Sequence, residues 1–371
     1  MLEKKKIVLG ITGGIAAYKA AELTREFVKR GASVHVIMTK NATAFLTPLT
    51  LQTLSGNPVY TDTFTLTGEW EIGHVSLAES ADAVVVAPAT ANFIGKAAAG
   101  IADDLLTTMI MATKAPVLIC PAMNVHMYAN TIVQENIAKL RTKGYVFVDP
   151  GYGELACKTE GLGRLAELED IVEEAESALT AKDLSAERIL VTAGPTREPV
   201  DPVRFITNYS SGKMGYAAAI VARRRGAEVT LISGPTPLPV PRGVRFIGVE
   251  SALEMRDAVM KELRDSTVII KAAAVADYRP KTFSGSKIKK RAGPLVLNLA
   301  RNPDIIAEIG EKKGKRIVVG FAVETDHLAE YAKKKMIQKN MDLIVANDIT
   351  QAGAGFQAET NVVKILDRQG G

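Results

Sequence analysis

Cysteine and histidine, on which disulfide frameworks and most zinc sites depend, are scarce in this sequence. Only two of the 371 residues are cysteine, Cys120 and Cys157, and they form no CxxC pair. This spacing excludes a disulfide-stapled fold and a zinc cluster. We expect both cysteines to be thiols in a reducing cytosol.

The sequence also lacks long hydrophobic runs. No apolar stretch approaches the roughly 20 residues that span a bilayer, and the longest, such as residues 83–88, have the length of a buried strand. The basic start, residues 1–6, leads into a strand without the apolar core or cleavage site of a signal peptide. We therefore expect a soluble cytoplasmic protein with no membrane partner.

The sequence has only a small excess of basic over acidic residues. The 46 Lys and Arg residues against 41 Asp and Glu residues give a formal net charge of +5. This excess is too small to predict nucleic-acid binding, but it suits anionic small ligands such as phosphates. With 371 residues, 47% hydrophobic and 23% charged, the chain has a globular composition and the length of two domains.

What the sequence does contain is a regular alternation of apolar strands and helices. In the first half we predict strands at residues 7–12, 34–38, 83–87, 116–120 and 145–148, and helices at 14–29, 94–113, 128–143 and 168–181. After a polar linker at 182–187, we predict strands at 189–193, 228–233, 268–272, 317–321, 343–346 and 362–366, and helices at 214–225, 253–263, 305–309 and 327–340. The fold class is α/β, with two doubly wound, Rossmann-like three-layer domains at 1–185 and 186–371.

Gly13 and Gly14 lie between the first strand and its helix, where backbone N–H groups can bind an anion. The segment is not GxGxxG, and the second strand ends in Thr39 and Lys40 rather than in an acid that would hold a ribose. A monophosphate such as that of FMN fits better than a dinucleotide. A tight turn without a ligand remains the alternative.

Polar segments at 87–92 and 121–128 follow two further predicted strands, and a glycine-rich segment at 155–164 surrounds Cys157. With the GITGGIAAYK opening and Gly73-His74-Val75, they make residues 7–167 resemble the homo-oligomeric flavin-containing cysteine decarboxylases. The resemblance implies FMN bound between the subunits of a trimer. Tyr128 stands where that family usually has Trp.

The same resemblance implies the decarboxylase site. His74 matches the base, Asn124 the residue that binds the substrate carboxylate, and Cys157 the proton donor. A local hydrogen-bonding role is the alternative for His74, whereas Cys120, His35 and His126 are interpreted as structural. The remaining matches are the FMN-binding Gly13, Gly14, Ile15, Thr39, Ala89, Thr90 and Asn92 and the substrate-binding Met123.

In the second half, Ser210, Ser211 and Lys213 precede a helix and can bind phosphate oxygens, although the segment is not a Walker A motif. An N-cap at Ser210 or Ser211 is the alternative. Asp277 ends another strand as a candidate Mg²⁺ ligand. The cationic run at 284–291 fits a phosphate ligand or a solvated flap; it is too short for nucleic acid and lacks interleaved aromatics.

The segments Asn-x-Ser-Ser-Gly-Lys-Met-Gly, Ala-Ala-Val-Ala-Asp-Tyr and Lys-x-Lys-Lys make residues 188–367 resemble phosphopantothenate–cysteine ligases. The two halves in this order are similar to the bacterial bifunctional enzymes of coenzyme A biosynthesis. The implied ligase activates 4′-phosphopantothenate with CTP and Mg²⁺, releases pyrophosphate, and joins the acyl-cytidylate to L-cysteine. The product is the substrate of the decarboxylase.

The resemblance implies that Asn208 holds the acyl-cytidylate and that Lys287 assists its formation. It assigns substrate contacts to Arg204, Ser210, Ser211 and Lys213, and CTP contacts to Ala273, Asp277, Pro303, Asp304, Ile305, Ile306, Phe321, Lys335 and Lys339. Because Lys335 and Lys339 are four residues apart, they share a helical face; a solvated basic face is the alternative. The implied assembly is a homo-oligomer of decarboxylase trimers and ligase dimers, with a dodecamer as one arrangement.

Two other functions remain open at this point. A non-enzymatic flavoprotein carrying a nucleotide-binding module would be yellow but would not turn over substrate. An NAD(P)-dependent reductase of two Rossmann-like halves would oxidise NAD(P)H and carry no flavin. Nucleotide-dependent pyrophosphate release with and without cysteine separates these alternatives from the ligase.

Overall fold

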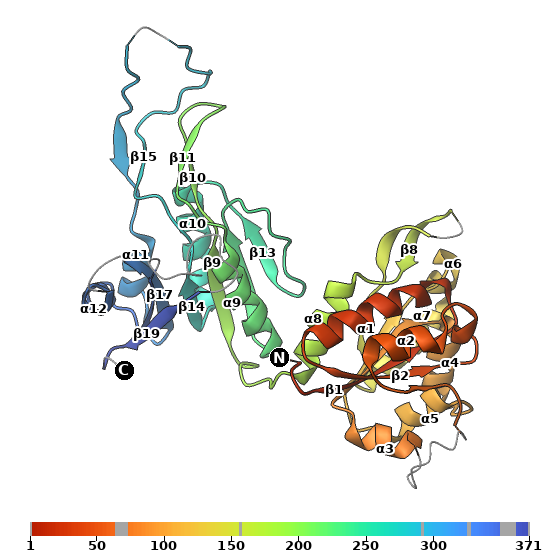
Figure 1. Ribbon diagram of the computed structural model, residues 1–371. Coiled ribbons are helices and arrows are strands. Elements are labelled where there is room, and N and C mark those ends of the chain that lie inside the picture. The colour runs from red at the N-terminus through yellow and green to blue at the C-terminus, as the bar shows by residue number, and fades with distance from the viewer. Residues whose placement is uncertain are drawn as a thin grey trace. The chain divides into compact units, whose positions relative to one another are not determined.

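The protein is described from a computed structural model, which places residues 2–63, 73–155, 158–290, 293–324, 328–348 and 361–369. The chain divides into two compact units, Met1–Thr180 and Ala181–Gly371. Each unit is an α/β sandwich around its own sheet (Figure 1). No helix in these described ranges combines the length and the apolar character needed to cross a lipid bilayer.

The first unit contains a six-stranded parallel sheet in the order β3-β2-β1-β4-β5-β6. Its strands are β1 (Lys6–Ile11), β2 (Ser33–Met38), β3 (Val59–Tyr60), β4 (Ala83–Ala89), β5 (Val117–Pro121) and β6 (Val146–Phe147). Every residue of β4 is buried, as expected for a strand with helices on both faces.

Two hydrophobic cores lie on the two faces of this sheet. One face packs against α1 (Lys19–Lys29), α2 (Pro48–Ser55) and α8 (Leu168–Leu179). The other packs against α3 (Gly73–Ser80), α4 (Ala91–Ala99), α5 (Leu105–Ala112) and α7 (Thr131–Thr142). The doubly wound arrangement predicted from the sequence is confirmed for this unit.

Several local predictions for the first unit were wrong. The helix predicted at 94–113 is divided by Gly100, whose φ of 72° is left-handed, and α5 restarts behind a capping box at Asp104. The glycine-rich segment at 155–164 forms part of an antiparallel hairpin of β7 (Gly151–Glu154), which precedes it, and β8 (Glu160–Arg164), which lies within it. The short helices η1 (Ile15–Tyr18), η2 (Ala42–Ala44) and α6 (Val125–Ala129) complete the unit.

Among the described residues, the second unit contains a seven-stranded sheet in the order β13-β12-β9-β14-β17-β18-β19, in which only the edge strand β19 is antiparallel. Its strands are β9 (Arg188–Ala193), β12 (Glu228–Ser233), β13 (Arg245–Gly248), β14 (Val268–Lys271), β17 (Ile317–Glu324), β18 (Leu343–Asp348) and β19 (Val363–Asp367). One face packs against α10 (Ala252–Glu262), α11 (Ile305–Glu311) and α12 (Leu328–Gln338), and the other against α9 (Lys213–Arg224).

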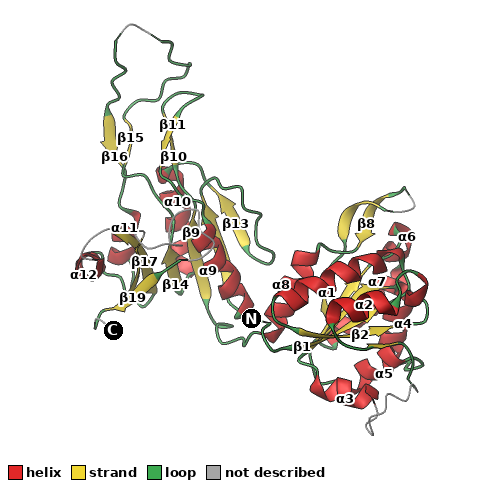
Figure 2. Cartoon of the chain, viewed as in Figure 1, coloured by secondary structure: helices red, strands yellow, loops and turns green. Residues whose placement is uncertain are grey.

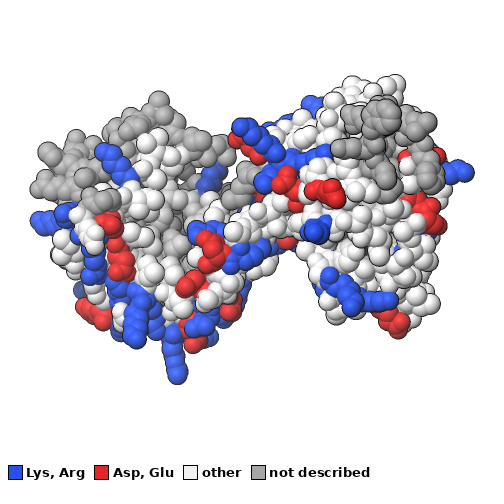
Figure 3. All heavy atoms as spheres, turned by 90° about the horizontal axis from the view of Figure 1, so that it is seen from below, with Lys and Arg blue, Asp and Glu red and all other residues white. Residues whose placement is uncertain are grey.

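The helices of this unit are α9 (Lys213–Arg224), α10 (Ala252–Glu262), η3 (Leu263–Asp265), α11 (Ile305–Glu311) and α12 (Leu328–Gln338). Residues 194–212, for which the sequence predicted neither strand nor helix, contain a hairpin, β10 (Arg197–Pro199) and β11 (Phe205–Thr207). A second hairpin, β15 (Tyr278–Pro280) and β16 (Leu299–Arg301), lies beside it, and the two form an arm that projects from the sheet (Figures 1 and 2). On the face of the molecule shown in Figure 3, basic and acidic side chains are interspersed.

Candidate functional sites

The carboxyl ends of β1, β4 and β5 form the edge of the first sheet where an open α/β fold binds its ligand. Strand β1 lies between β2 and β4. On one side of β1 the sheet continues through β2 to β3, and on the other side it continues through β4 and β5 to β6. Two cavities of about 440 Å³ each open at this edge. Both include Gly13, Thr90 and Met127 in their walls, so they are adjacent.

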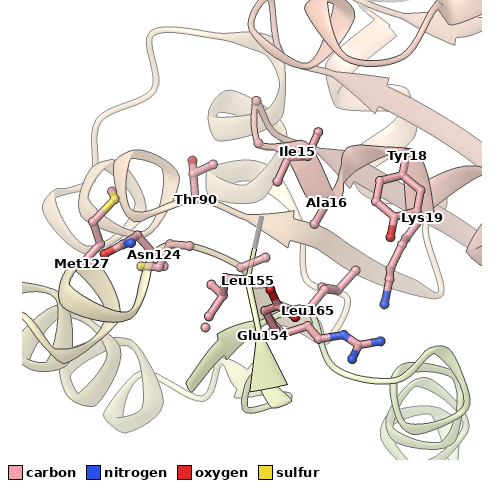
Figure 4. Close-up of a pocket in the computed structure, with 16 residues that line it drawn as sticks. Ile15, Ala16, Tyr18, Lys19, Thr90, Asn124, Met127, Glu154, Leu155 and Leu165 are labelled. Atoms are coloured by element: carbon pink, nitrogen blue, oxygen red, sulfur yellow. The ribbon is translucent and has the colours of Figure 1, made fainter. Parts of the chain in front are cut away.

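Most of the residues predicted for the flavin and the decarboxylase substrate line these two cavities. The first contains Gly13, Gly14, Ile15, Thr90, Met123 and Asn124. The second contains Gly13, Thr39, Thr90 and Asn92. Figure 4 shows Asn124 and Met127 at one end of the first cavity, and Tyr18 and Lys19 at the other.

The start of helix η1 is suited to an anionic ligand. Gly14 precedes the helix, and no side chain caps its first N–H groups. At Gly13 an added Cβ would collide with the Cβ of Asn41, so only glycine allows this close packing. Lys40 adds positive charge to the wall of the second cavity, whereas Lys96 in the same wall is paired with Asp103 and Asp104. These features fit the phosphate and elongated shape of a flavin mononucleotide.

Asn124 is held at the start of α6. Its side-chain oxygen accepts a hydrogen bond of 2.9 Å from the backbone N–H of His126, which fixes the plane of the amide. The neighbouring Met123 N–H donates to the carbonyl of Gly163, at 2.9 Å, and so ties this segment to β8. The hairpin thus supports the residue predicted to bind the substrate carboxylate.

Other predicted residues lie elsewhere or outside the described positions. Ala89 is fully buried in β4 and lines neither cavity. His74 is in the first turn of α3, but its side chain, like Cys157, lies outside the described residues. Cys120 is a buried thiol in β5, consistent with a structural role. Burial lowers the pKa of His35 in β2, and nearby Lys6 lowers it further.

Sequence reasoning missed several cavity residues. Tyr18, the last residue of η1, and Lys19, the first residue of α1, lie in the GITGGIAAYK opening, but neither was selected as a site residue. Glu154 and Arg164 come from the β7–β8 hairpin, which was predicted as a loop. The polar character of that loop was the available signal.

In the second unit, the segment after β14 brings several predicted ligase residues toward the end of β9. Asn208 Nδ2 lies 3.5 Å from the carbonyl oxygen of Ala274, and Pro195 forms a β-bridge with Ala274. Ala273 is half-buried and Asp277 is exposed on the same segment. The described residues contain no cluster of three His, Cys, Asp or Glu that could hold a metal.

The residues predicted to bind CTP gather beside α11. Asp304 caps this helix by accepting from Ala307 N–H, and Lys339 Nζ lies 2.8 Å from its other oxygen. Burial tends to raise the pKa of Asp304, but the hydrogen bonds from Lys339 and from Ala307 N–H, together with the charges of Lys339 and Lys271, hold the pKa below its usual range. Lys335 lies in the last turn of α12, and Lys339 follows the end of this helix, with its N–H donating to the carbonyl of Lys335 at 3.0 Å, in agreement with a shared face.

The other predicted CTP contacts differ in exposure. Pro303 and Phe321 are half-buried, whereas the side chains of Ile305 and Ile306 are packed in the hydrophobic core below α11. Any contact that these two isoleucines make with a nucleotide must come from their backbone. The N-terminal end of α11 presents that backbone next to Asp304.

The segment before α9 differs from the predicted N-cap. Gly212, with a left-handed φ of 78°, precedes the helix, rather than Ser210 or Ser211. The two serine hydroxyls accept from Gly212 N–H at 3.3 Å and Lys213 N–H at 3.5 Å. They therefore lie at the amino end of α9, where the sequence predicted phosphate contacts.

Lys271, at the carboxyl end of β14, was missed because it was interpreted as the polar end of a strand. Part of its side chain is accessible, but protein surrounds its amino group, which lies 3.4 Å from the carbonyl oxygen of Ala273. Burial, together with the charges of Lys335 and Lys339, lowers the pKa of Lys271 to about 8, against the opposing effect of Asp304 and Asp277. Lys271 thus adds a third lysine to the Asp304–Lys339 cluster.

Lys271→Met is expected to stabilise the second unit by about 1–3 kcal/mol at pH 7, because the folded state disfavours the charged lysine. In the wild type, the free energy of unfolding should rise between pH 8 and 10.5, where the unfolded chain still holds the proton that the folded chain has lost. Urea unfolding of both proteins at pH 7 and 9.5 measures the difference. If the difference in free energy of unfolding between the two proteins does not narrow at pH 9.5, the lowered pKa of Lys271 is wrong.

A third cavity, of about 510 Å³, lies at the carboxyl ends of β12 and β13. Its wall includes Tyr216, Thr236, Phe246 and Glu250, and none of the predicted site residues. The Glu250 carboxylate lies 3.6 Å from Arg197 Nη1, and the backbone N–H of Glu250 donates to the carboxylate of Glu254. Both acidic side chains of this wall therefore already have partners within the protein.

Two family models together match almost the whole chain. The model described as "Flavoprotein" matches residues 1–180. The model described as "DNA/pantothenate metabolism flavoprotein C-terminal domain" matches residues 184–371.

Full-length relatives carry both parts. A protein of Bacillus subtilis (strain 168) named "Coenzyme A biosynthesis bifunctional protein CoaBC" is 52% identical over 100% of this chain and 92% of its own length. A protein of Vibrio cholerae with the same name is 50% identical over 100% of this chain and 93% of its length. A solved structure of the C-terminal domain of a CoaBC protein is 47% identical, covers 52% of this chain and 86% of that one, and has a TM-score of 0.45.

Proposed function

Because the chain belongs to the family of bifunctional coenzyme A biosynthesis proteins, we propose that it catalyses two consecutive steps of that pathway. The second unit ligates cysteine to 4′-phosphopantothenate, and the first unit decarboxylates the product. The observation that carries the proposal is the pair of adjacent cavities that share Gly13, Thr90 and Met127. They combine an anion-binding helix start with a polar end at Asn124.

For the ligase, we assign CTP and Mg²⁺ to the edge formed by the segment after β14 and by α11. Attack of the 4′-phosphopantothenate carboxylate on the α-phosphate develops negative charge, which Lys287 and the Lys271–Lys335–Lys339 cluster would stabilise. Asn208 would donate its amide to the acyl-cytidylate carbonyl while the cysteine amine attacks. Asp277 would hold Mg²⁺ with the nucleotide phosphates.

For the decarboxylase, Asn124 would bind the substrate carboxylate and His74 would remove the thiol proton. A bound FMN would supply a reversible hydride acceptor, so that the substrate undergoes no net oxidation. Cys157 would return a proton after CO2 leaves, since an unperturbed thiol is mostly protonated at neutral pH. Both steps are assigned to the cytoplasm, where this thiol stays reduced.

We also infer a homo-oligomer, with trimers of the first unit and dimers of the second. Ile15 and Tyr18, 58% and 60% exposed, and Met127, 48% exposed, border the first cavity. Apolar side chains at the rim of a binding site suit an interface that a neighbouring subunit covers.

A coupled assay tests the proposal. The purified protein should be yellow and, with CTP, Mg²⁺, cysteine and 4′-phosphopantothenate, should release pyrophosphate and CO2 in equal amounts. Without cysteine, pyrophosphate release should stop after about one turnover, and no CO2 should appear. A colourless protein that oxidises NAD(P)H would support the reductase instead, whereas a yellow protein without either product would support the non-enzymatic alternative.

A further inference from the structure

Asp201 lies at the tip of the β10–β11 hairpin and is the centre of a buried hydrogen-bond network. Its side chain has no exposed surface, although the arm around it projects from the sheet. One oxygen, Oδ1, accepts from the N–H groups of Val203 and Arg204 at 2.8 and 2.9 Å. These bonds close the hairpin turn locally, as aspartate commonly does.

The other oxygen serves a different segment of the chain. Asp201 Oδ2 accepts from the backbone N–H of Ile288 at 3.0 Å, across 87 residues of sequence, and from Arg204 Nη1 at 2.8 Å. Arg204 Nη1 in turn donates to the carbonyl of Ile288 at 3.1 Å. Both backbone polar groups of Ile288 are therefore held by the hairpin.

A further contact holds the same segment from its other side. Ser284 N–H donates to the carbonyl of Val200 at 3.1 Å, and Ser284 Oγ donates to the carbonyl of Ser286 at 2.7 Å. Lys287 lies between these attachments, and its own side chain is exposed. The backbone on either side of Lys287 is thus held by the hairpin, while the Lys287 side chain is exposed.

The negative charge of Asp201 suits an acceptor of hydrogen bonds from both the hairpin turn and Ile288. Although burial tends to raise the pKa of Asp201, hydrogen bonds from the N–H groups of Ile288, Val203 and Arg204 and the Arg204 charge hold it below its usual value. The carboxylate therefore stays ionised at neutral pH and accepts all four hydrogen bonds. A local turn needs only Oδ1, so the turn does not explain the contacts of Oδ2.

We propose that Asp201, together with Arg204, is a positioning residue of the ligase, which fixes the segment 284–288 so that Lys287 reaches the nucleotide phosphates. This inference rests on the proposed role of Lys287. A lysine on a long flexible side chain acts on a transition state only if its backbone is placed within about 1 Å, and a misplacement of that size can cost on the order of 100-fold in rate.

The variant Asp201→Asn separates the two functions of the carboxylate. Asparagine has one acceptor oxygen, which can keep the local turn, but it then directs an NH2 group at the N–H of Ile288. Asp201→Ser is a second variant, whose short hydroxyl can close the turn without reaching Ile288. Glu262→Gln is the matched control, because Glu262 pairs with Arg245 on the surface of the same unit, away from the arm.

Both Asp201 variants should lower kcat for CTP-dependent pyrophosphate release about tenfold or more, with KM for CTP changed less than about twofold. Decarboxylation of preformed 4′-phosphopantothenoylcysteine should stay at the wild-type rate, and Glu262→Gln should leave both activities unchanged. Hydrogen exchange should increase at Ile288 and remain slow in β9 and β14.

A double-mutant cycle with Lys287→Ala excludes a general structural effect. If Asp201 acts through Lys287, Asp201→Asn should lower the rate of the Lys287→Ala protein by less than about twofold. An equal loss in both backgrounds, or a wild-type kcat in both Asp201 variants, would overturn the inference. A wild-type protein that releases no pyrophosphate with CTP would instead refute the proposed function.

Discussion

Lys287→Ala is expected to lower CTP-dependent pyrophosphate release by about 100-fold or more, the usual cost of removing one group that stabilises a charged transition state. The exposed Lys287 amino group is carried by a segment whose backbone is fixed on both sides. Because the loss concerns charge developed in the transition state, kcat should fall more than the affinity for CTP. Quenched-flow measurement of the acyl-cytidylate should show that it no longer forms.

Asn208→Ala, in contrast to Lys287→Ala, is expected to form the acyl-cytidylate but to consume it slowly. Asn208 lies on the segment before α9, and its amide is 3.5 Å from the carbonyl oxygen of Ala274. If it serves the second half-reaction, its loss should leave acyl-cytidylate formation intact and make that species accumulate in the presence of cysteine.

Lys281→Ala is the control for both variants, because Lys281 is an exposed lysine on the same arm. It should retain the wild-type rates of pyrophosphate release and of transfer to cysteine. Full coupled activity in Lys287→Ala or in Asn208→Ala would show that the role assigned to that residue is wrong.

The sheet strands were predictable because their apolar runs are buried on both faces. Strands β1, β4, β9 and β12 were located to within about two residues. The edge strand β13 was missed, since Arg245 and Phe246 are exposed and leave no continuous apolar run. The three-residue strands of the arm were missed because antiparallel partners, rather than their own composition, define them.

The site residues, like the strands, were predictable only where the local sequence itself carries the signal. Gly13, Gly14 and Thr39 could be selected because their position after a strand has a direct physical meaning, and the structure places them in cavity walls. Lys271 could not, because its lowered pKa depends first on burial in the folded unit and then on lysines more than 60 residues away in the sequence. Asp201 likewise acquires its second partner from residue 288. Such contacts follow from the packing of whole units.

Gly163→Ala is expected to lower decarboxylation by about 100-fold or more and to leave the ligase unchanged. Gly163 has a φ of 150°, which side chains rarely adopt, and an added Cβ would collide with the carbonyl oxygen of Met123. That oxygen belongs to the backbone that leads into Asn124. The hairpin and this segment must therefore separate, and displacement of Asn124 by about 1 Å accounts for a loss of this size.

Gly151→Ala is the matched control in the same hairpin. The Cβ added there would be 3.9 Å from its nearest neighbour, the carbonyl oxygen of Arg164, so it makes an ordinary contact. CO2 release from preformed 4′-phosphopantothenoylcysteine, with flavin content and pyrophosphate release measured on the same samples, separates loss of substrate binding from loss of the cofactor or of the fold. Equal decarboxylation by the two glycine variants would contradict the support that β8 gives to Asn124. If Gly163→Ala decarboxylates much more slowly than Gly151→Ala but binds a normal amount of flavin, the hairpin supports substrate binding rather than flavin binding. The flavin-binding glycines follow a different strand.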